Sequence, residues 1–314
     1  MADLRTATAG ELAAFPDRSR GYWADALVRL LRTPAGVAGL IIVSALIVIA
    51  VVGPLVVPWS YEDQDLEAVV AFGGPLPPGS PGHILGTDAL GRDLLARTLD
   101  GARVSLTVAL VAQLVVIAIG VPLGLIAGWR GGLVEATLMR FTDIIATFPD
   151  LLFIVMIQAA IVDTPFFTVL NGLLATFVAI GLIAWVGTAR LVRAQTLALK
   201  QREDIEAARA IGVTEGNILR RHILPQALGP IAVAVSLGIP MAILAEATLS
   251  FLGLGVQIPR ASWGSLIDGG IDNITRAPWL VFPPALALGV ALVGFTLLGD
   301  GMRDAFDPRT SSRR

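Results

Sequence analysis

Six stretches of the chain are apolar over lengths that match the hydrocarbon core of a membrane. They cover residues 35–57, 104–128, 141–162, 170–189, 226–251 and 279–299. A helix of about 23 residues rises about 34 Å, which is enough to cross a hydrocarbon core of about 30 Å. Only 15% of the residues are charged, against about 25% in an average soluble domain. We therefore predict an all-α polytopic membrane protein with six transmembrane helices, rather than a large soluble protein with buried helices.

Arginine and lysine are distributed unequally between the two sides that six spans define. The N-terminal segment, the loops near 129–140 and 190–223 and the C-terminal tail hold 18 of them. The loops near 58–103, 163–169 and 252–278 hold 5. Cytoplasmic loops of membrane proteins carry the excess of positive charge. The pattern predicts that both termini and the 190–223 loop are cytoplasmic.

The first span is predicted to be an uncleaved anchor rather than a signal peptide. Asp3, Glu11 and Asp17 precede it, and its apolar run is too long for the core of a signal sequence. Ahead of it, the segment YWADALVRLLRTP has the spacing of a helix that lies in the membrane interface. We expect three regions, which are an N-terminal segment with this helix (1–34), a six-span transmembrane domain (35–299) and a tail (300–314).

The loop after the first span, residues 58–103, is predicted to end in an amphipathic helix. Its first part is rich in acidic residues, glycine and proline, which is typical of loop. Leucine then recurs at helical spacing in HILGTDALGRDLLARTLDGARVSL, and Gly101 is placed to end that helix. We expect it to lie on the outer face, as a lead-in to the second span or as a platform for an external partner.

The residues needed for common catalytic chemistry are missing. A phosphate-binding loop of the Walker type needs a lysine, and the only lysine, Lys200, stands in LALKQRED, outside any such motif. His83 and His222 fall in loops on opposite sides of the predicted membrane, so neither can belong to a metal site or a serine–histidine pair. We therefore expect no catalytic residue and no metal ligand in this chain.

Three carboxylates lie in or beside predicted spans: Asp143, Asp150 and Glu246. A charge at the bilayer centre costs about 2.5–3.5 kcal/mol on insertion scales, so these side chains should face protein or water. Asp150 follows Pro149, and its two interpretations are a polar pathway and packing against a helix end. Glu246 lies near the outer end of the fifth span, which favours solvation at the interface.

A polar segment, EAARAIGVTEGNILRRHILP, separates the fourth and fifth spans at residues 206–225. Its spacing predicts a short helix that Gly212 breaks, most simply through a positive φ. The apolar face of this helix is expected to hold Ile205, Ala208 and Ile211. Its charged face is expected to hold Arg202, Glu206 and Arg209 at salt-bridge spacing.

A second short helix is predicted after the glycine, with Thr214 as its cap. Its stripe is expected to hold Ile218, Leu219, His222 and Ile223. Helix connections are commonly only about 2–8 residues long, so twenty patterned residues are unnecessary for a simple link. We predict a compact knob that presents an apolar stripe with charged edges to a groove on a partner protein.

The same segment resembles the EAA-loop signature of the permeases of binding-protein-dependent ABC importers. The matching residues are Glu206, Ala207, Ala208, Gly212, Ile223, Leu224 and Pro225. Three further stretches are similar to the C-type permease of dipeptide and oligopeptide importers. They are LGTDALGRDLLARTLDGARVSL, ILAEATLSFLGLGVQIPRASWGSLI and LLGDGMRDAFDPR. The resemblance extends from about residue 22 over nearly the whole chain; it departs at Gly216, which weakens the second helix of the knob.

The resemblance implies the type I ABC importer permease fold in a bacterial cytoplasmic (inner) membrane. It implies that the 190–225 loop is a coupling loop seated in a cleft of an ATP-binding subunit, with Ile218 beside the motif residues. The implied partners are a second (B-type) permease subunit, two cytoplasmic ATP-binding subunits, an extracytoplasmic substrate-binding protein and membrane lipid, with no nucleic acid. ATP and Mg would be held by the ATP-binding subunits, and this chain would bind no cofactor.

The resemblance implies di- and oligopeptides as substrates. The alternative is the same permease role for another solute, because related permeases carry nickel, glutathione or other solutes. Two other classes of protein remain. A secondary transporter or channel would need ion-coordinating residues within its spans and often has inverted repeats, which this sequence lacks. A structural membrane scaffold would have the same topology, but changes in the knob would then have no effect on transport.

Overall fold

The computed structural model describes residues 22–165 and 169–306, and all the regular structure in these ranges is helical. The predicted regions before residue 22 and after residue 306 lie outside the described residues. Five helices are long and apolar enough to cross a membrane. They are α2 (Pro34–Val56), α4 (Leu94–Arg130), α8 (Leu173–Lys200), α11 (Leu224–Phe251) and α13 (Phe282–Phe306). The prediction of an all-α polytopic protein is confirmed.

The third predicted span, 141–162, is not one straight helix. The structure has α5 (Gly132–Ala146) and α6 (Asp150–Ile161), which meet at an angle of 83°. Pro149 has no N–H for the helical ladder, and its ring disfavours helical backbone at the residue before it. The last turn of α5 therefore closes at Thr147 and Phe148, and the chain restarts in a new direction. If this bent pair is counted as one span, the described residues contain six.

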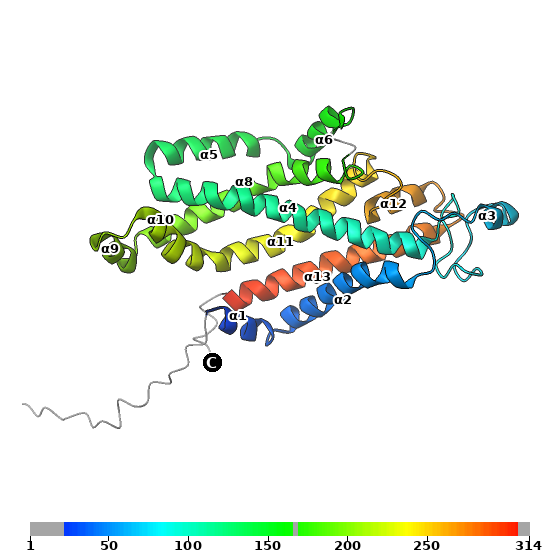
Figure 1. Cartoon of the computed structure of the whole chain (residues 1–314), viewed down its shortest axis with the longest axis horizontal. Helices are drawn as coiled ribbons and strands as arrows, with labels where there is room; N and C mark the ends of the chain where they lie inside the picture. Colours follow the sequence, from blue (N-terminus) through cyan, green and yellow to red (C-terminus); the bar gives the residue numbers. More distant parts are fainter. Residues whose placement is uncertain (1–21, 166–168, 307–314) are drawn as a thin grey trace, which may run out of the picture.

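Shorter helices gather at the two ends of the bundle (Figure 1). At one end lie α1 (Tyr22–Leu30), α9 (Glu203–Ala210), α10 (Glu215–Ile218) and a π-helical turn, η2 (Leu219–Ile223). At the other end lie α3 (Leu66–Phe72), α12 (Trp263–Ile271) and a 3-10 turn, η3 (Pro278–Leu280). The helix α1 packs on α13, so the first helix and the last helical residues lie at the end that carries α9.

The predicted outer-face helix at 90–101 is wrong as a separate element. Gly101 does not end a helix, because α4 runs without a break from Leu94 to Arg130. Asp93 caps it, accepting a hydrogen bond from the backbone N–H of Ala96 at 2.7 Å. The other carboxylate oxygen of Asp93 lies 2.8 Å from Nδ1 of His83, which is buried. The loop before α4 is thus fastened to the start of that helix.

The most extensive contact in the bundle is between α4 and α8, and three glycines make it possible. Gly120, Gly124 and Gly128 recur every four residues and so lie on one face of α4. A Cβ built at each would stand within 2.5 to 2.9 Å of an atom of α8. Small residues at this spacing let two membrane helices approach until their backbones are almost in contact. This stripe fixes the position of α8 against α4.

A proline inside α2 interrupts its backbone hydrogen bonds, and a side chain of α4 compensates for the loss. Pro54 lies inside α2 and leaves the carbonyl of Ala50 without its helical N–H partner. Arg103 supplies a substitute, because its Nε donates to that carbonyl at 2.6 Å and its Nη2 donates to the carbonyl of Val51 at 2.7 Å. The guanidinium thus satisfies two backbone oxygens and joins the first two spans.

Candidate functional site

Residues 203–223, which we call the knob, stand at one end of the bundle as two short helical pieces around a glycine turn (Figure 1). Gly212 has a φ of 82°, as the sequence predicts. Its N–H donates to the carbonyl of Arg209 at 3.0 Å, and the N–H of Val213 donates to the carbonyl of Ala208 at 3.1 Å. These two bonds are the paired closure that commonly ends a helix at a left-handed glycine.

The apolar stripe of the knob faces its own chain rather than a partner. Ile205, Ala208, Ile218 and Ile223 are buried and pack around Trp129, at the end of α4. The expectation that Ile218 and Ile223 contact a partner is therefore wrong for this conformation. Ile211 also departs from its predicted face, because it is 81% exposed. The side of α9 turned outward carries Glu206, Ala207, Ala210 and Ile211.

The knob packs on Trp129, a residue that no pattern in the sequence singles out. The guanidinium of Arg209 lies over its ring at 4.5 Å from the centroid, and Nζ of Lys200 lies 5.6 Å from the same centroid. Lys200 also donates to the backbone carbonyl of Trp129. Two cations on one indole ring, with the four buried apolar side chains, join the knob to both α4 and α8.

The charged residues at the knob form polar contacts, but with other partners than the sequence spacing predicts. Arg202 donates to Asp204 at 3.0 Å and to Gln226 at 2.9 Å, in place of a pair with Glu206. The hydrogen bond from Arg202 holds the pKa of Asp204 below its usual range. Thr214 stands at the start of α10, but its side chain makes no capping hydrogen bond. Leu224 is partly buried and Pro225 is exposed at the start of α11.

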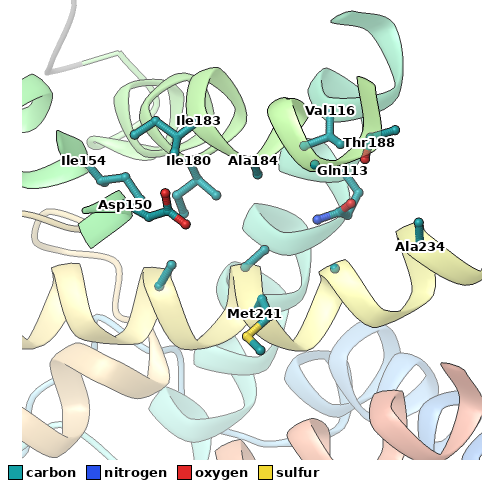
Figure 2. A pocket seen from close by; sticks show the side chains of 14 residues that line it. Gln113, Val116, Asp150, Ile154, Ile180, Ile183, Ala184, Thr188, Ala234 and Met241 are labelled. Atoms are coloured by element: carbon teal, nitrogen blue, oxygen red, sulfur yellow. The ribbon is translucent and has the colours of Figure 1, made fainter. Parts of the chain in front are cut away.

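A cavity of about 350 Å³ opens between four helices of the transmembrane domain (Figure 2). Its walls come from α4, α6, α8 and α11, and most of the lining side chains are apolar. The polar ones are Gln113, Asp150 and Thr188. The carboxylate of Asp150 points into the space between α8 and α11 (Figure 2). Of the two interpretations of Asp150, the geometry favours a lining position over packing against a helix end.

The other two predicted carboxylates lie away from this cavity lining. Asp143 pairs with Arg190, whose Nη2 is 2.8 Å from its Oδ1, and the Asp143 side chain is 57% exposed. Glu246 is completely buried and accepts hydrogen bonds from Ser105 at 2.9 Å and Ser250 at 2.7 Å. The expectation that Glu246 is solvated at the interface is wrong. Two hydroxyl donors take the place of water for this carboxylate.

The surroundings of Glu246 join three helices near the end of the bundle opposite the knob. Ser105 of α4 donates to Glu246 of α11, and it accepts a hydrogen bond of 3.3 Å from the N–H of Trp263, the first residue of α12. A second tie is the ion pair between Asp100 of α4 and Arg260, at 2.7 Å, in the loop before α12. These contacts fix α12 across the end of the bundle.

The sequence matches two known families, and together they span most of the chain. Residues 120–312 match the family described as "Binding-protein-dependent transport system inner membrane component". Residues 21–78 match the family described as "N-terminal TM domain of oligopeptide transport permease C".

Curated relatives are similar over almost their full length. The oligopeptide transport system permease protein OppC of Haemophilus influenzae is 40% identical over 98% of this chain and 95% of its own length. The dipeptide transport system permease protein DppC of Bacillus subtilis is 39% identical over 93% and 87%. The glutathione transport system permease protein GsiD of Pectobacterium atrosepticum is 37% identical over 98% of both chains.

A solved structure shares the fold at lower sequence similarity. A chain of the MetNI methionine ABC transporter, in an inward-facing conformation, aligns with a TM-score of 0.53 and 22% identity. The alignment covers 68% of this chain and 96% of that one. The expected type I ABC importer permease fold is therefore confirmed. The chain belongs to the family of binding-protein-dependent transport system inner membrane components, whose members are permease subunits of ABC importers rather than enzymes.

Proposed function

We propose that this chain forms half of the translocation pathway of an ATP-driven importer of di- and oligopeptides. The relatives named for oligopeptide and dipeptide transport support the substrate class. The observation that carries the proposal is the continuity between the knob and the walls of the cavity. α8 runs from the cavity directly into the knob, and the knob runs through η2 directly into α11, which forms the facing wall.

This continuity supports a mechanical role for the knob. A displacement of the knob moves the ends of α8 and α11 together, and Trp129 passes the same displacement to α4. Three of the four helices around the cavity therefore respond to one contact. Two separate ATP-binding subunits would bind ATP and Mg, and their closure would favour one conformation of the cavity over the other. The outward side of α9, with Glu206, Ala207 and Ile211, is the surface that we assign to this contact.

The proposed assembly has this chain beside a second, B-type permease subunit, with an extracytoplasmic substrate-binding protein at the α12 end. We infer that the knob end is cytoplasmic in a bacterial inner membrane, with both termini on that side. The charge asymmetry supports this orientation. So does the presence of α1, the last turn of α13 and the knob at the same end.

The proposal is tested by reconstituting the complete transporter in proteoliposomes and measuring uptake of labelled peptides, glutathione and nickel. We expect peptide uptake that requires ATP and the binding protein, and no ATPase activity from this chain purified alone. The chain lacks a phosphate-binding lysine, which is the reason for the second expectation. Peptide uptake driven by an ion gradient without ATP would contradict the coupling. Uptake of glutathione or nickel without peptide would contradict the substrate class.

A further inference from the structure

The cavity contains one charged side chain in mostly apolar surroundings. Of the 14 side chains drawn around it in Figure 2, Asp150 is the one that bears a charge. Gln113 and Thr188 lie toward the other end of the same space (Figure 2). The rest are apolar side chains and glycine. Any molecule that fills the cavity therefore meets a carboxylate at one place and neutral surfaces elsewhere.

The fold holds this carboxylate at the cavity. Asp150 is the first residue of α6, directly after the bend at Pro149. A carboxylate in the first turn of a helix is stabilised by the helix dipole, by about 0.3–1 kcal/mol. The bend thus brings a helix start, where a negative charge is favoured, to the wall of a cavity inside a transmembrane domain.

Asp150 has no cationic partner in the described part of the chain. The side chain is exposed, and neither an ion pair nor a side-chain hydrogen bond involves it within residues 22–165 and 169–306. Asp143 shows the contrast, because seven residues earlier it pairs with Arg190 at 2.8 Å. Ionisable groups in membrane domains are costly and usually serve a pathway or a partner. The carboxylate of Asp150 is left open for a cation that this chain does not supply.

We propose that Asp150 receives the cationic group of the transported peptide, either its terminal ammonium or a lysine or arginine side chain. The inference rests on the proposed function and adds a charge preference to it. A charge pair is stronger in a cavity with apolar walls than in water, because the local dielectric constant is lower. Gln113 and Thr188 are placed to hydrogen-bond peptide amides at the other end of the space.

The cavity volume suits such a role. Its roughly 350 Å³ falls at the low end of the range of about 300–1,000 Å³ usual for small-molecule sites. It therefore accommodates one end of a short peptide. A second permease subunit would enclose the remainder.

The test compares the substrate preference of wild-type and Asp150→Asn transporters in proteoliposomes, with the same binding protein for both. Four tripeptides form two matched pairs. The members of the first pair differ at one position, which is lysine in one and norleucine in the other. The members of the second pair differ only at the N-terminus, which is free in one and acetylated in the other. Dividing the variant's preference by that of the wild type cancels the contribution of the binding protein. We expect Asp150→Asn to lower the preference for the cationic member of one pair on the order of tenfold, the change that 1.4 kcal/mol gives.

The two pairs identify the source of the cation. A change in the acetylation pair assigns the carboxylate to the terminal ammonium, and a change in the lysine pair assigns it to a side chain. Asp143→Asn is the matched control, since it removes another carboxylate of the same domain outside the cavity lining and should change neither preference.

Two results would overturn the inference while leaving the proposed function intact. One is an equal loss of uptake for all four peptides in Asp150→Asn, which would assign the carboxylate to packing or to the second subunit. The other is unchanged uptake of all four. A wild-type transporter that imports none of the peptides would contradict the proposed function and, with it, this inference.

Discussion

Replacing Gly212 with valine is expected to lower peptide uptake by roughly tenfold or more while the permease stays in the membrane near wild-type levels. The φ of 82° at this residue is the cause. A Cβ costs on the order of 1 kcal/mol in left-handed backbone, and a β-branched residue costs more. Apart from its two chain neighbours, no atom lies within 4 Å of a Cβ built there, so the strain comes from the backbone alone. The spans are distant from the turn, and we expect them to insert normally.

Loss of this turn changes how the knob is presented. The two bonds that close α9 depend on the conformation of Gly212. Without them, the outward side of α9 shifts relative to Ile218 and Ile223, which remain packed on Trp129. The measurement is peptide uptake together with the amount of ATP-binding subunit that stays on the purified permease. We expect weaker retention, or ATP hydrolysis that no longer drives uptake.

Two glycine-specific controls separate conformation from bulk. Gly216→Val places the same side chain in the same knob, at a glycine in helical conformation that also has no atom within 4 Å of a built Cβ. It should transport normally. Gly212→Asn should keep much of the activity, because asparagine tolerates left-handed backbone. Glu206→Ala should be mild, since it removes one exposed contact and keeps the turn. Wild-type uptake and retention in Gly212→Val would make the segment a linker.

The second large effect is expected in the transmembrane domain, where Gly124→Val should reduce the yield of folded permease and abolish uptake. A Cβ at this position would lie 2.5 Å from the carbonyl oxygen of Ala189 and 2.7 Å from Cβ of Val192. Backbone cannot move aside as a side-chain end can, so α4 and α8 must separate. Overpacking of this kind typically costs about 1–3 kcal/mol, and occasionally more. Both helices line the cavity, so its shape is lost with the contact.

The check is the amount of monodisperse protein after solubilisation and the midpoint of its thermal unfolding. We expect the midpoint of Gly124→Val to fall by several degrees. Gly289→Val is the matched control, because Gly289 lies within α13 and no atom is within 4 Å of its built Cβ. Equal midpoints for the two variants would show that the glycine contact between α4 and α8 does not stabilise the bundle.

The sequence predicted the straight spans well and missed the bent one. Hydropathy placed the first span at 35–57 and the fifth at 226–251, close to the observed α2 and α11. It joined the residues on both sides of Pro149 into one run, because a hydropathy average over a window of residues carries no information on the direction of the helix axis. Proline marks a break in the helix but does not give the new direction, which is the 83° between α5 and α6 as both pack against α8.

The sequence predicted the turn of the knob but gave its apolar stripe the wrong partner. A glycine between two short helical patterns is a local signal, and its positive φ is confirmed. Periodicity says only that Ile205 and Ile218 share an apolar surface, not what covers it. The cover is Trp129, far away in the sequence. The surroundings of Glu246 could not be predicted for the same reason, because its hydrogen-bond donor Ser105 is 141 residues away in the sequence. Contacts between residues so far apart produce no periodic pattern in the sequence.

We propose that the outward side of the knob is the surface on which an ATP-binding subunit acts. The most direct test replaces Ile211 with a photo-crosslinking amino acid in the complete transporter and identifies the protein captured on illumination. Ile211 is 81% exposed on the knob, and Ile258, 77% exposed in the loop before α12, gives a matched site at the opposite end. We predict an adduct with the ATP-binding subunit from position 211 and none from position 258. An ATP-binding subunit that remains bound but is captured only from position 258, or from neither position, would contradict the assignment of this contact to the knob.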